Sequence, residues 1–254
     1  GGPGASMRSG MAQLTAETDE EAIALARKLA ALLPANNLDE PADFSADDIN
    51  RELPALNAID KLDDVRDLIK GVADLGDVIE FGEDFAPSMV TAIGKIGGTT
   101  VGFLANQAGK DEGRLTVYGC KKAARFAAFC DCFSIPIVSV VDSMGMKISS
   151  APQGELSRAG AQLMFALSEA TAPRVALVVG QAIGMSYAAM ASRAASDIVY
   201  AWPGSVFSTV TAQIAAQLLY ADEMRSAEDP YAKRAELERR YMDDVADAVH
   251  AAKA

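Results

Sequence analysis

The sequence predicts an α/β protein with a parallel-rich sheet covered by helices. Between residues 119 and 202, wholly apolar strand segments alternate with segments of helical periodicity, which is typical of a parallel sheet with helices packed on its faces. The chain has 254 residues, of which 50% are apolar, so it can form a large buried core. In such folds the loops that follow the strand ends bind ligands.

The N-terminal part of the chain is expected to be a lead-in to this domain. Residues 1–10 are rich in glycine and lack periodicity, whereas residues 17–33 carry apolar positions at helical spacing behind an acidic first turn, which suits a helix N-terminus. Residues 34–54 are rich in Asn, Asp and Pro, which favour turns and caps. We therefore expect a lead-in, a helix and a connector over residues 1–60, and the main domain over residues 61–254.

The main domain begins with a helix expected over residues 64–75 and a strand and turn over residues 78–85. Two short strands follow within residues 89–107, joined at Gly97-Gly98, a dipeptide that favours a tight hairpin. The other expected elements are a helix over 119–133 with Ala123, Phe126, Ala127 and Cys130 on one face, a strand over 135–145, a helix over 154–172, a strand over 174–179, a short helix over 186–196, a strand over 197–202, and helices over 209–225 and 231–254.

Composition argues against several classes of function. The net charge of −12 disfavours a nucleic-acid surface, because phosphate binding needs concentrated Lys and Arg. The single histidine, His250, lies in a charged, Ala-rich tail, where a solvated residue is expected rather than a general base. Cys120, Cys130 and Cys132 lack the paired spacing of a zinc site, so we expect reduced packing residues and no metal. With no signal peptide and no apolar run of about 18 residues, the protein is expected to be cytoplasmic.

The most informative stretch is RVALVVGQAIGMSY at residues 174–187. An apolar, β-rich run breaks at Gly180 and again at Gly184 before a series of small residues. A strand that stops at glycine and turns into a helix leaves backbone N–H groups unpaired and aimed at one point, which stabilises negative charge. The loops at residues 142–145 and 180–186 are therefore the expected ligand-binding loops. On spacing alone, ordinary turn chemistry is the alternative interpretation.

Several motifs occur in the order found in a known family. They are LPANN (33–37), a strand ending in ANQ (105–107), KKAARFAAFCDCFSIPIVSVVDSMG (121–145), a Gly-bearing helix ending in SEATAPRV (168–175), QAIGMSYAAM (181–190) and YAWP (200–203). Over about residues 10–250 the chain resembles the C-terminal half of the biotin-dependent acyl-CoA carboxyltransferases. This family includes the carboxyltransferase subunits of propionyl-CoA and methylcrotonyl-CoA carboxylases, and of the sodium-pumping decarboxylases for methylmalonyl-CoA and glutaconyl-CoA.

The resemblance implies a crotonase-like (ClpP/crotonase) fold of repeated ββα units and transfer of a carboxyl group between biotin and an acyl-CoA. In the family, carboxybiotin reaches the C-terminal half and acyl-CoA the N-terminal half, and each half supplies a backbone oxyanion hole. Alignment of A-I-G-M-S-Y with the family's A-Y-G-G-A-Y loop implies that the N–H groups of Met185 and Ser186 hold the biotin ureido oxygen. Gly184 would shape the turn, and Tyr187 would complete the biotin loop.

The resemblance also implies a substrate pocket that includes Ala188, Gly145 and Gly154. The implied chemistry needs no histidine, because carboxybiotin that has lost its carboxyl group has a basic ureido nitrogen that can take the α-proton of the acyl-CoA. The protein then mainly stabilises two oxyanions, and an aimed backbone donor contributes about 3–4 kcal/mol in a dry site. Met185 and Ser186 replace Gly and Ala of the family, which keeps both N–H groups but adds bulk. A Met amide can serve if φ is negative at that position.

Partners follow from the same resemblance. The chain begins at Gly1-Gly2, where the family's N-terminal half would end, so an N-terminal half or separate subunit is expected to supply the CoA site. The isolated half is expected to form a homo-oligomer or pair, and to be inactive alone. Because residues 144–147 (MGMK) are not a biotin-attachment motif, a separate biotin carrier protein is expected. A membrane decarboxylase subunit is a further candidate partner, and no nucleic acid is expected.

Two other functions remain open from the sequence. A crotonase relative that acts as a hydratase or isomerase usually has a carboxylate beside the acyl pocket, and Asp142 and Glu155 offer a candidate pair. A non-catalytic assembly subunit of a carboxylase or decarboxylase complex would have Met185 plugging the biotin tunnel. Substitution of both carboxylates by Ala with activity kept would exclude the hydratase or isomerase, and biotin binding separates the assembly subunit from the carboxyltransferase. The sequence does not identify the acyl-CoA or the direction of the reaction.

Overall fold

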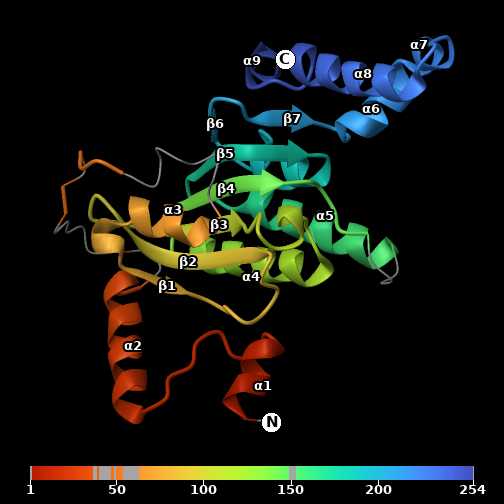
Figure 1. Cartoon of the computed structure of the whole chain (residues 1–254). Helices are drawn as coiled ribbons and strands as arrows, with labels where there is room; N and C mark the ends of the chain where they lie inside the picture. Colours follow the sequence, from red (N-terminus) through yellow and green to blue (C-terminus); the bar gives the residue numbers. More distant parts are fainter. Residues whose placement is uncertain are drawn as a thin grey trace.

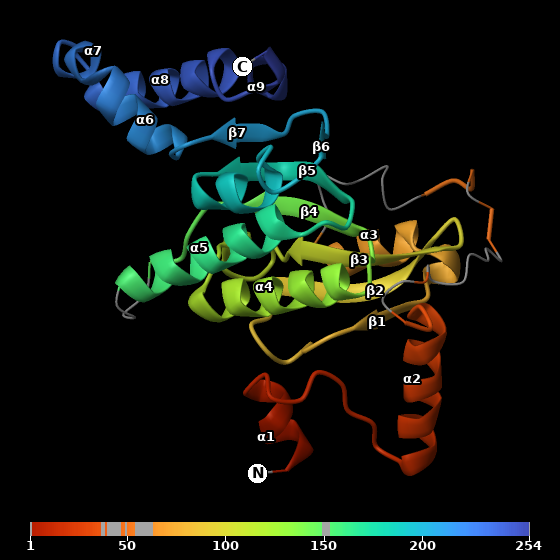
Figure 2. The same cartoon turned by 180° about the vertical axis from the view of Figure 1, so that it is seen from behind.

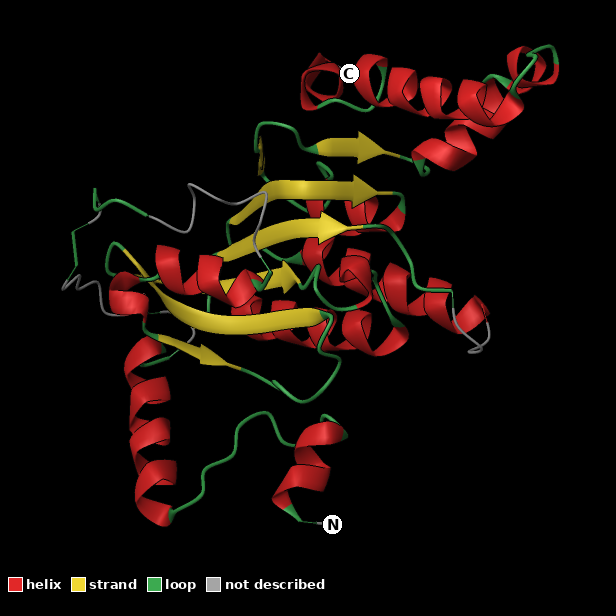
Figure 3. Ribbon diagram, viewed as in Figure 1, coloured by secondary structure: helices red, strands yellow, loops and turns green. Residues whose placement is uncertain are grey.

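The computed structural model of the chain describes residues 2–36, 39, 47–48, 50–53, 63–148 and 153–253. In this part of the chain, a central sheet has helices on both faces (Figures 1–3). The strands are β1 (Val78–Glu80), β2 (Met89–Ile96), β3 (Thr99–Asn106), β4 (Ile137–Ser143), β5 (Arg174–Ile183), β6 (Ile198–Ala201) and β7 (Val206–Ser208). The helices are α1 (Pro3–Arg8), α2 (Asp19–Leu32), α3 (Val65–Val72), α4 (Val117–Cys132), α5 (Gln153–Glu169), α6 (Ala212–Leu219), α7 (Ala221–Arg225), α8 (Pro230–Asp244) and α9 (Ala248–Lys253), with the single turns η2 (Asp74–Gly76), η3 (Asp111–Gly113) and η4 (Tyr187–Ala191).

The sheet has the strand order β1-β2-β3-β4-β5-β6, and β7 pairs with the last residues of β5 beyond β6. The pairs β1–β2 and β2–β3 are antiparallel, and every pair from β3 onward is parallel. The predicted parallel-rich sheet is therefore confirmed. Because parallel strands all end at the same edge, the loops after β3, β4, β5 and β7 lie together.

The predicted hairpin between β2 and β3 is also confirmed. Gly97 and Gly98 have φ of +58° and +88°, a pair of values that only glycine adopts without strain. The carboxylate of Asp74 accepts the N–H groups of both glycines, at 2.8 and 2.7 Å. The turn is thus closed by a charged side chain from η2.

Alternate residues of β2 and β3 face opposite layers. Met89, Ile93 and Leu104 belong to the cluster that includes α4 and α5, which cover one face (Figure 2). Val90 and Phe103 belong to a second cluster with α3 on the other face (Figure 1). The predicted buried face of α4 is confirmed, with Ala123, Phe126, Ala127 and Cys130 all at most 5% exposed.

The strand expected over residues 174–179 is longer than predicted and runs on to Ile183 as β5. Gly180 lies inside the strand, so the predicted break there is wrong. The physical reason for glycine is space, since an added Cβ at Gly180 would overlap the carboxylate of Asp142. The second predicted break is correct, because the strand ends directly before Gly184.

The C-terminal helices are shorter than expected. Residues 209–225 form α6 and α7, separated at Tyr220 with φ −121° and ψ +27°. In place of the single helix predicted over residues 231–254, the structure has α8 and α9, because the chain turns inward after Asp244 to bury Ala246, which is 0% exposed. These helices extend beyond β7, at the opposite edge of the sheet from α1 and α2 (Figure 1).

The lead-in is more ordered than predicted. Residues 3–8 form α1 with Pro3 in its first turn and Met7 buried, whereas no regular structure was expected there. The helix predicted over residues 17–33 is confirmed as α2, capped by the Thr18 hydroxyl, which accepts the N–H of Glu21. Most of the expected connector and the boundary at residue 60 lie outside the described residues, so the division into two parts stays a prediction. No helix in the described ranges is long and apolar enough to cross a membrane.

Candidate functional site

The ends of β4 and β5 lie side by side and bring together the two loops singled out in the sequence (Figure 1). Ser143 is paired with Ala182 in the register of these strands. Gly145 has φ +94°, and an added Cβ there would lie 3.3 Å from the carbonyl oxygen of Ile183. Gly145 therefore lies against the end of β5, next to the second loop.

Gly184 forms the turn that follows β5. Its φ is +56°, and its N–H donates to the carbonyl oxygen of Ser208 over 2.7 Å. The next amide with a backbone acceptor is that of Ala188, which donates to the carbonyl oxygen of Gly184 over 3.1 Å. Within the described residues, the N–H groups of Met185 and Ser186 have no hydrogen-bond acceptor. The N–H of Tyr187 has no acceptor there either, so three consecutive donors are left open after the turn, as in the first turn of a helix.

The backbone after the turn accommodates both substituted residues. Positive φ falls on Gly184, and Met185 is not among the described residues with positive φ. Ser186 has φ −67° and ψ −39°, an ordinary right-handed conformation. The condition for a Met amide donor is therefore met, and the substitutions leave the turn unstrained.

The Ser186 side chain is fully buried and points back toward the strand ends. Its Oγ donates to the carbonyl oxygen of Ile183 at 2.7 Å, with the carbonyl oxygen of Ser143 at 3.3 Å as a second acceptor. The hydroxyl thus ties the ends of β4 and β5 together beneath the turn. Its amide has no such partner.

The side chains of Met185 and Tyr187 pack on neighbouring elements. An added Cβ at Gly160 in α5 would lie 3.4 Å from Cγ of Met185, so the thioether chain rests against a small residue of α5. The ring of Tyr187 meets that of Phe207 edge-on, with centroids 5.9 Å apart and an interplanar angle of 84°. The short helix expected over residues 186–196 is reduced to the π-helical turn η4, a structure often found at functional sites.

Of the other two residues implied for the substrate pocket, only Ala188 adjoins the turn. It is half-buried, and its N–H donates to Gly184. Gly154 is exposed in the first turn of α5, and no atom lies within 4 Å of an added Cβ. The structure gives Gly154 no contact with the turn, and its place in a pocket stays a prediction.

An open cavity of about 760 Å³ adjoins the turn on the side of β7. Its lining residues include Ile183, which precedes Gly184, Ser208, which accepts the Gly184 N–H, and the two arginines Arg114 and Arg239. The residues that follow Gly184 in the loop do not line it. A volume of several hundred Å³ is in the range of small-molecule sites, so there is room for a ligand beside the turn.

The two carboxylates considered for a hydratase have separate partners. Oδ1 of Asp142 accepts the N–H of Gln181 at 2.9 Å, and the carboxylate lies against Gly180. The Glu155 carboxylate lies 4.0 Å from Nζ of Lys121 on α4. The structure therefore does not pair them, and nothing in it favours acid–base chemistry by these two groups.

The cysteine prediction is correct for two of the three residues. Cys120 and Cys130 are buried, and burial raises the pKa of each thiol to about 12. Cys132 is exposed at the end of α4, so its expected packing role is wrong. His250 is exposed, as predicted. In the ranges that the structure describes, no group of three His, Cys, Asp or Glu side chains could hold a metal ion.

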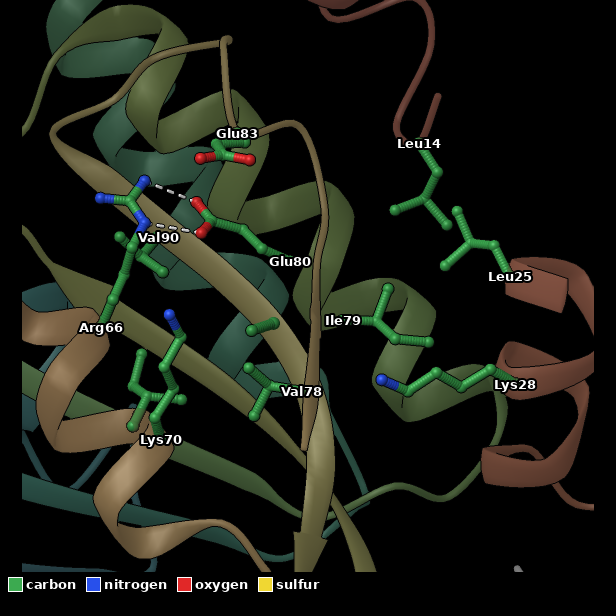
Figure 4. Close-up of a pocket in the computed structure, with 12 residues that line it drawn as sticks. Leu14, Leu25, Lys28, Arg66, Lys70, Val78, Ile79, Glu80, Glu83 and Val90 are labelled. Atoms are coloured by element: carbon green, nitrogen blue, oxygen red, sulfur yellow. Dashed lines mark hydrogen bonds and ion pairs between the residues drawn. The ribbon is translucent and has the colours of Figure 1, made fainter. Parts of the chain in front are cut away.

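A second cavity, of about 330 Å³, lies at the other edge of the sheet between α2, α3 and β1. Figure 4 shows Arg66 of α3 facing Glu80 of β1 there, with Nε–Oε2 and Nη2–Oε1 distances of 2.6 and 2.7 Å. The bond to Glu80 raises the pKa of Arg66 above its usual value. This bidentate pair fixes α3 to the edge strand, which is a structural role.

Sequence reasoning missed the residues that hold the turn from the side of β7. The carbonyl of Ser208 accepts the Gly184 N–H, and its hydroxyl lies 2.7 Å from the hydroxyl of Tyr241 in α8. Strand β7 has only three residues, too few to show a strand period. No pattern in the sequence could have linked Tyr241 to Gly184.

Comparison with known proteins adds independent information. A profile described as the carboxyl transferase domain matches residues 1–254. The propionyl-CoA carboxylase carboxyltransferase subunit of Haloferax mediterranei is 36% identical over 252 residues, which cover 96% of this chain and 49% of that protein. The methylmalonyl-CoA carboxyltransferase 12S subunit of Propionibacterium freudenreichii subsp. shermanii is 39% identical over 235 residues, covering 90% and 45% respectively. The chain thus spans about half the length of the curated relatives it matches.

Solved structures agree with these relatives. The transcarboxylase 12S structure with methylmalonyl-coenzyme A and methylmalonic acid bound, described as a hexamer assembly, has a TM-score of 0.93 at 36% identity and covers 100% of this chain and 50% of that chain. A single-chain, multi-domain long-chain acyl-CoA carboxylase has a TM-score of 0.78 at 20% identity, over 100% of this chain and 25% of that one, which is a likeness of fold. The predicted crotonase-like fold is confirmed. By sequence over its whole length and by structure, this chain belongs to the carboxyl transferase family.

Proposed function

We propose that this chain is the biotin-binding, C-terminal half of an acyl-CoA carboxyltransferase, and that it helps to move a carboxyl group between biotin and an acyl-CoA. The N–H groups of Met185 and Ser186 would hold the biotin ureido oxygen, with Gly184 shaping the loop and Tyr187 completing it. The observation that carries the proposal is that the N–H groups of Met185 and Ser186, the first two after Gly184, have no acceptor within the described residues.

The glycine turn between β2 and β3 supports this use of paired amides. The consecutive N–H groups of Gly97 and Gly98 both donate to the carboxylate of Asp74, at 2.8 and 2.7 Å. Successive N–H groups at turns form concave sites for anions. After Gly184 a similar pair of donors is open, and an oxygen that gains negative charge is the acceptor that suits it.

Biotin, when bound, supplies the carried carboxyl group and a ureido oxygen on which charge develops as that group leaves. The part of this chain is to present donors that need no rearrangement, each worth about 3–4 kcal/mol in a dry site. Preorganisation comes from Ser208, which holds Gly184, and from the Ser186 hydroxyl, which anchors the loop to Ile183. No titrating side chain is needed for this role.

The proposal assigns acyl-CoA binding and the delivery of biotin to partners of this half. Since the chain spans about half of its curated relatives, we assign acyl-CoA binding to an N-terminal half, on the same polypeptide or on a second subunit. Biotin would arrive on a separate carrier protein. The hexameric description of the transcarboxylase 12S relative supports a homo-oligomer as the working form.

Substitution of Ser186 tests the role of its amide. Ser186→Pro removes the N–H, while φ of −67° at this position already suits proline. Ser186→Ala is the matched control, because it removes the buried hydroxyl and keeps the amide. With the N-terminal half present, we expect kcat for carboxyl transfer between methylmalonyl-CoA and free biotin to fall about 100-fold or more in Ser186→Pro, and far less in Ser186→Ala. Thermal unfolding of both variants checks that they fold.

An equal loss of activity in these two variants would contradict the amide role. Met185→Gly then addresses the alternative of an assembly subunit. Because the Met185 side chain rests against Gly160 in α5, we expect activity within about threefold of the wild type, an effect below 1 kcal/mol. Activity that appears only in Met185→Gly would indicate a plugged, structural subunit instead.

A further inference from the structure

Strand β5 has a bulge directly before the Gly184 turn. The register with β4 pairs Val141 with Val178 and then Ser143 with Ala182, so one residue of β4, Asp142, lies opposite three residues of β5. Bulges redirect strand ends and are common next to active sites. The bulge here lies between the regular part of the sheet and the loop of the proposed biotin site.

The side chain of Asp142 fills this bulge. Its Oδ1 accepts the N–H of Gln181 at 2.9 Å, so the carboxylate bonds a bulge amide where the regular ladder is interrupted. An added Cβ at Gly180 would overlap the same carboxylate, and an added Cβ at Gly113 would overlap the Asp142 carbonyl oxygen. Two glycines from different elements therefore leave the space that this one aspartate occupies.

The bulge decides where β5 ends. If the register before it continued, Ser143 would face Gly180 instead of Ala182, and the Gly184 turn would lie ~7 Å further along the strand direction. In the observed register, Oγ of Ser186 lies 3.3 Å from the carbonyl oxygen of Ser143. The position of the loop thus depends on the two additional residues that the bulge takes up.

We propose that Asp142 is a positioning residue for the N–H groups of Met185 and Ser186. It accepts the Gln181 amide, holds the bulge, and thereby fixes the register in which β5 delivers the turn. The role needs an acceptor oxygen of the right reach and does not need a negative charge. The inference rests on the proposed function of the two amides, and it gives Asp142 no contact with substrate.

Three variants of the chain, each combined with its N-terminal half, test the proposal. Asp142→Ala removes the acceptor, whereas Asp142→Asn keeps Oδ1 and removes the charge. Asp131→Ala is the matched control, because the Asp131 carboxylate accepts the N–H groups of Thr171 and Ala172 at the opposite end of β5. It removes bonds of the same kind far from the turn.

We expect kcat for transfer between methylmalonyl-CoA and free biotin to fall about 100-fold in Asp142→Ala, as for loss of an oriented donor. Asp142→Asn should recover most of this loss, and Asp131→Ala should change kcat little. If Asp142→Asn is as inactive as Asp142→Ala, the charge itself is required and the positioning role is overturned. Equal losses in Asp142→Ala and Asp131→Ala would also overturn it, since a general loss of stability would explain both.

Amide hydrogen exchange on the same proteins tests the positioning role without any activity. The Gly184 N–H, bonded to Ser208, should lose protection in Asp142→Ala and keep it in Asp131→Ala and Asp142→Asn. Unchanged protection of Gly184 in Asp142→Ala would overturn the inference even if activity falls. If the wild type shows no transfer at all, the proposed function fails while this measurement still decides the role of Asp142. Should Asp142→Ala not fold, Gly180→Ala, which displaces the carboxylate, takes its place.

Discussion

At the antiparallel end of the sheet, charged side chains form hydrogen bonds to the backbone groups of two loops. At the parallel end, backbone N–H groups of the Gly184 turn have no hydrogen-bond acceptor within the described residues. Asp74 accepts both N–H groups of the β2–β3 hairpin turn. Lys122 of α4 donates to the carbonyl oxygens of Gly82 and Phe85, at 2.8 and 2.9 Å, in the loop between β1 and β2. After Gly184, by contrast, the next three N–H groups, which include those of Met185 and Ser186, have no acceptor within the described residues.

The difference separates loops that serve the fold from a loop that can serve a ligand. A buried backbone group without a hydrogen-bond partner costs free energy. In two loops of this chain, the side chains of Asp74 and Lys122 provide such partners. At the Gly184 turn, the polar contacts are instead arranged around the amides: Asp142 on the side of β4, Ser208 on the side of β7, and the Ser186 hydroxyl beneath. The turn is held firmly while its donors stay available.

Among the tests that compare the two ends of the sheet, removal of the Asp74 carboxylate should lower the free energy of unfolding the most. Asp74→Ala leaves the N–H groups of Gly97 and Gly98 without their acceptor, and Gly98 is buried. We expect the free energy of unfolding in urea to fall by about 2–4 kcal/mol. Asp74→Asn, which keeps one acceptor oxygen, should lose less. Carboxyl transfer per folded molecule should not change, and a loss below about 1 kcal/mol would contradict the closing role of Asp74.

Prediction from sequence succeeded where the signal was local and failed where it depended on distant contacts. The dipeptide Gly97-Gly98 by itself predicts the hairpin, and the buried face of α4 follows from the spacing of its apolar residues. Gly180 looked like a strand end, because nothing near it in the sequence shows that Asp142 needs the space. The Gly184 turn was found from its own residues. Its supports, Ser208 and Tyr241, come from elements that carry no local signal.

Lys122 should make the free energy of unfolding depend on pH, by less than the loss expected for Asp74→Ala. Burial lowers its pKa from 10.5 to about 8. Below the lower value both the folded and the unfolded chain hold the proton, but between the two values the folded protein has released it and the unfolded chain has not. The free energy of unfolding should therefore rise with pH across this window, by up to about 1.4 kcal/mol per pH unit.

Urea unfolding of the wild type and Lys122→Met at about pH 7.5, 9 and 10 measures this contribution. Other groups also titrate in this range, so the difference between the two proteins is the relevant quantity. It should change with pH in the stated direction, in favour of the wild type as the pH rises. A difference that is constant over the window would mean that Lys122 keeps its ordinary pKa and that the loop carbonyls compensate for its burial.

Thiol alkylation should give the smallest effect, because it does not measure the free energy of unfolding. It reports only how often α4 separates from the antiparallel part of the sheet. Cys120 and Cys130 are buried in α4 with thiol pKa values of about 12, whereas Cys132 is exposed. In native buffer, iodoacetamide should modify Cys132 rapidly and the other two only when α4 separates from the sheet. Cys132→Ser should abolish the fast phase, and Asp74→Ala should accelerate the slow one. Fast modification of Cys130 in the native wild type would mean that α4 does not stay packed on β3. The contrast between a tightly held antiparallel end and an open turn at the parallel end would then fail.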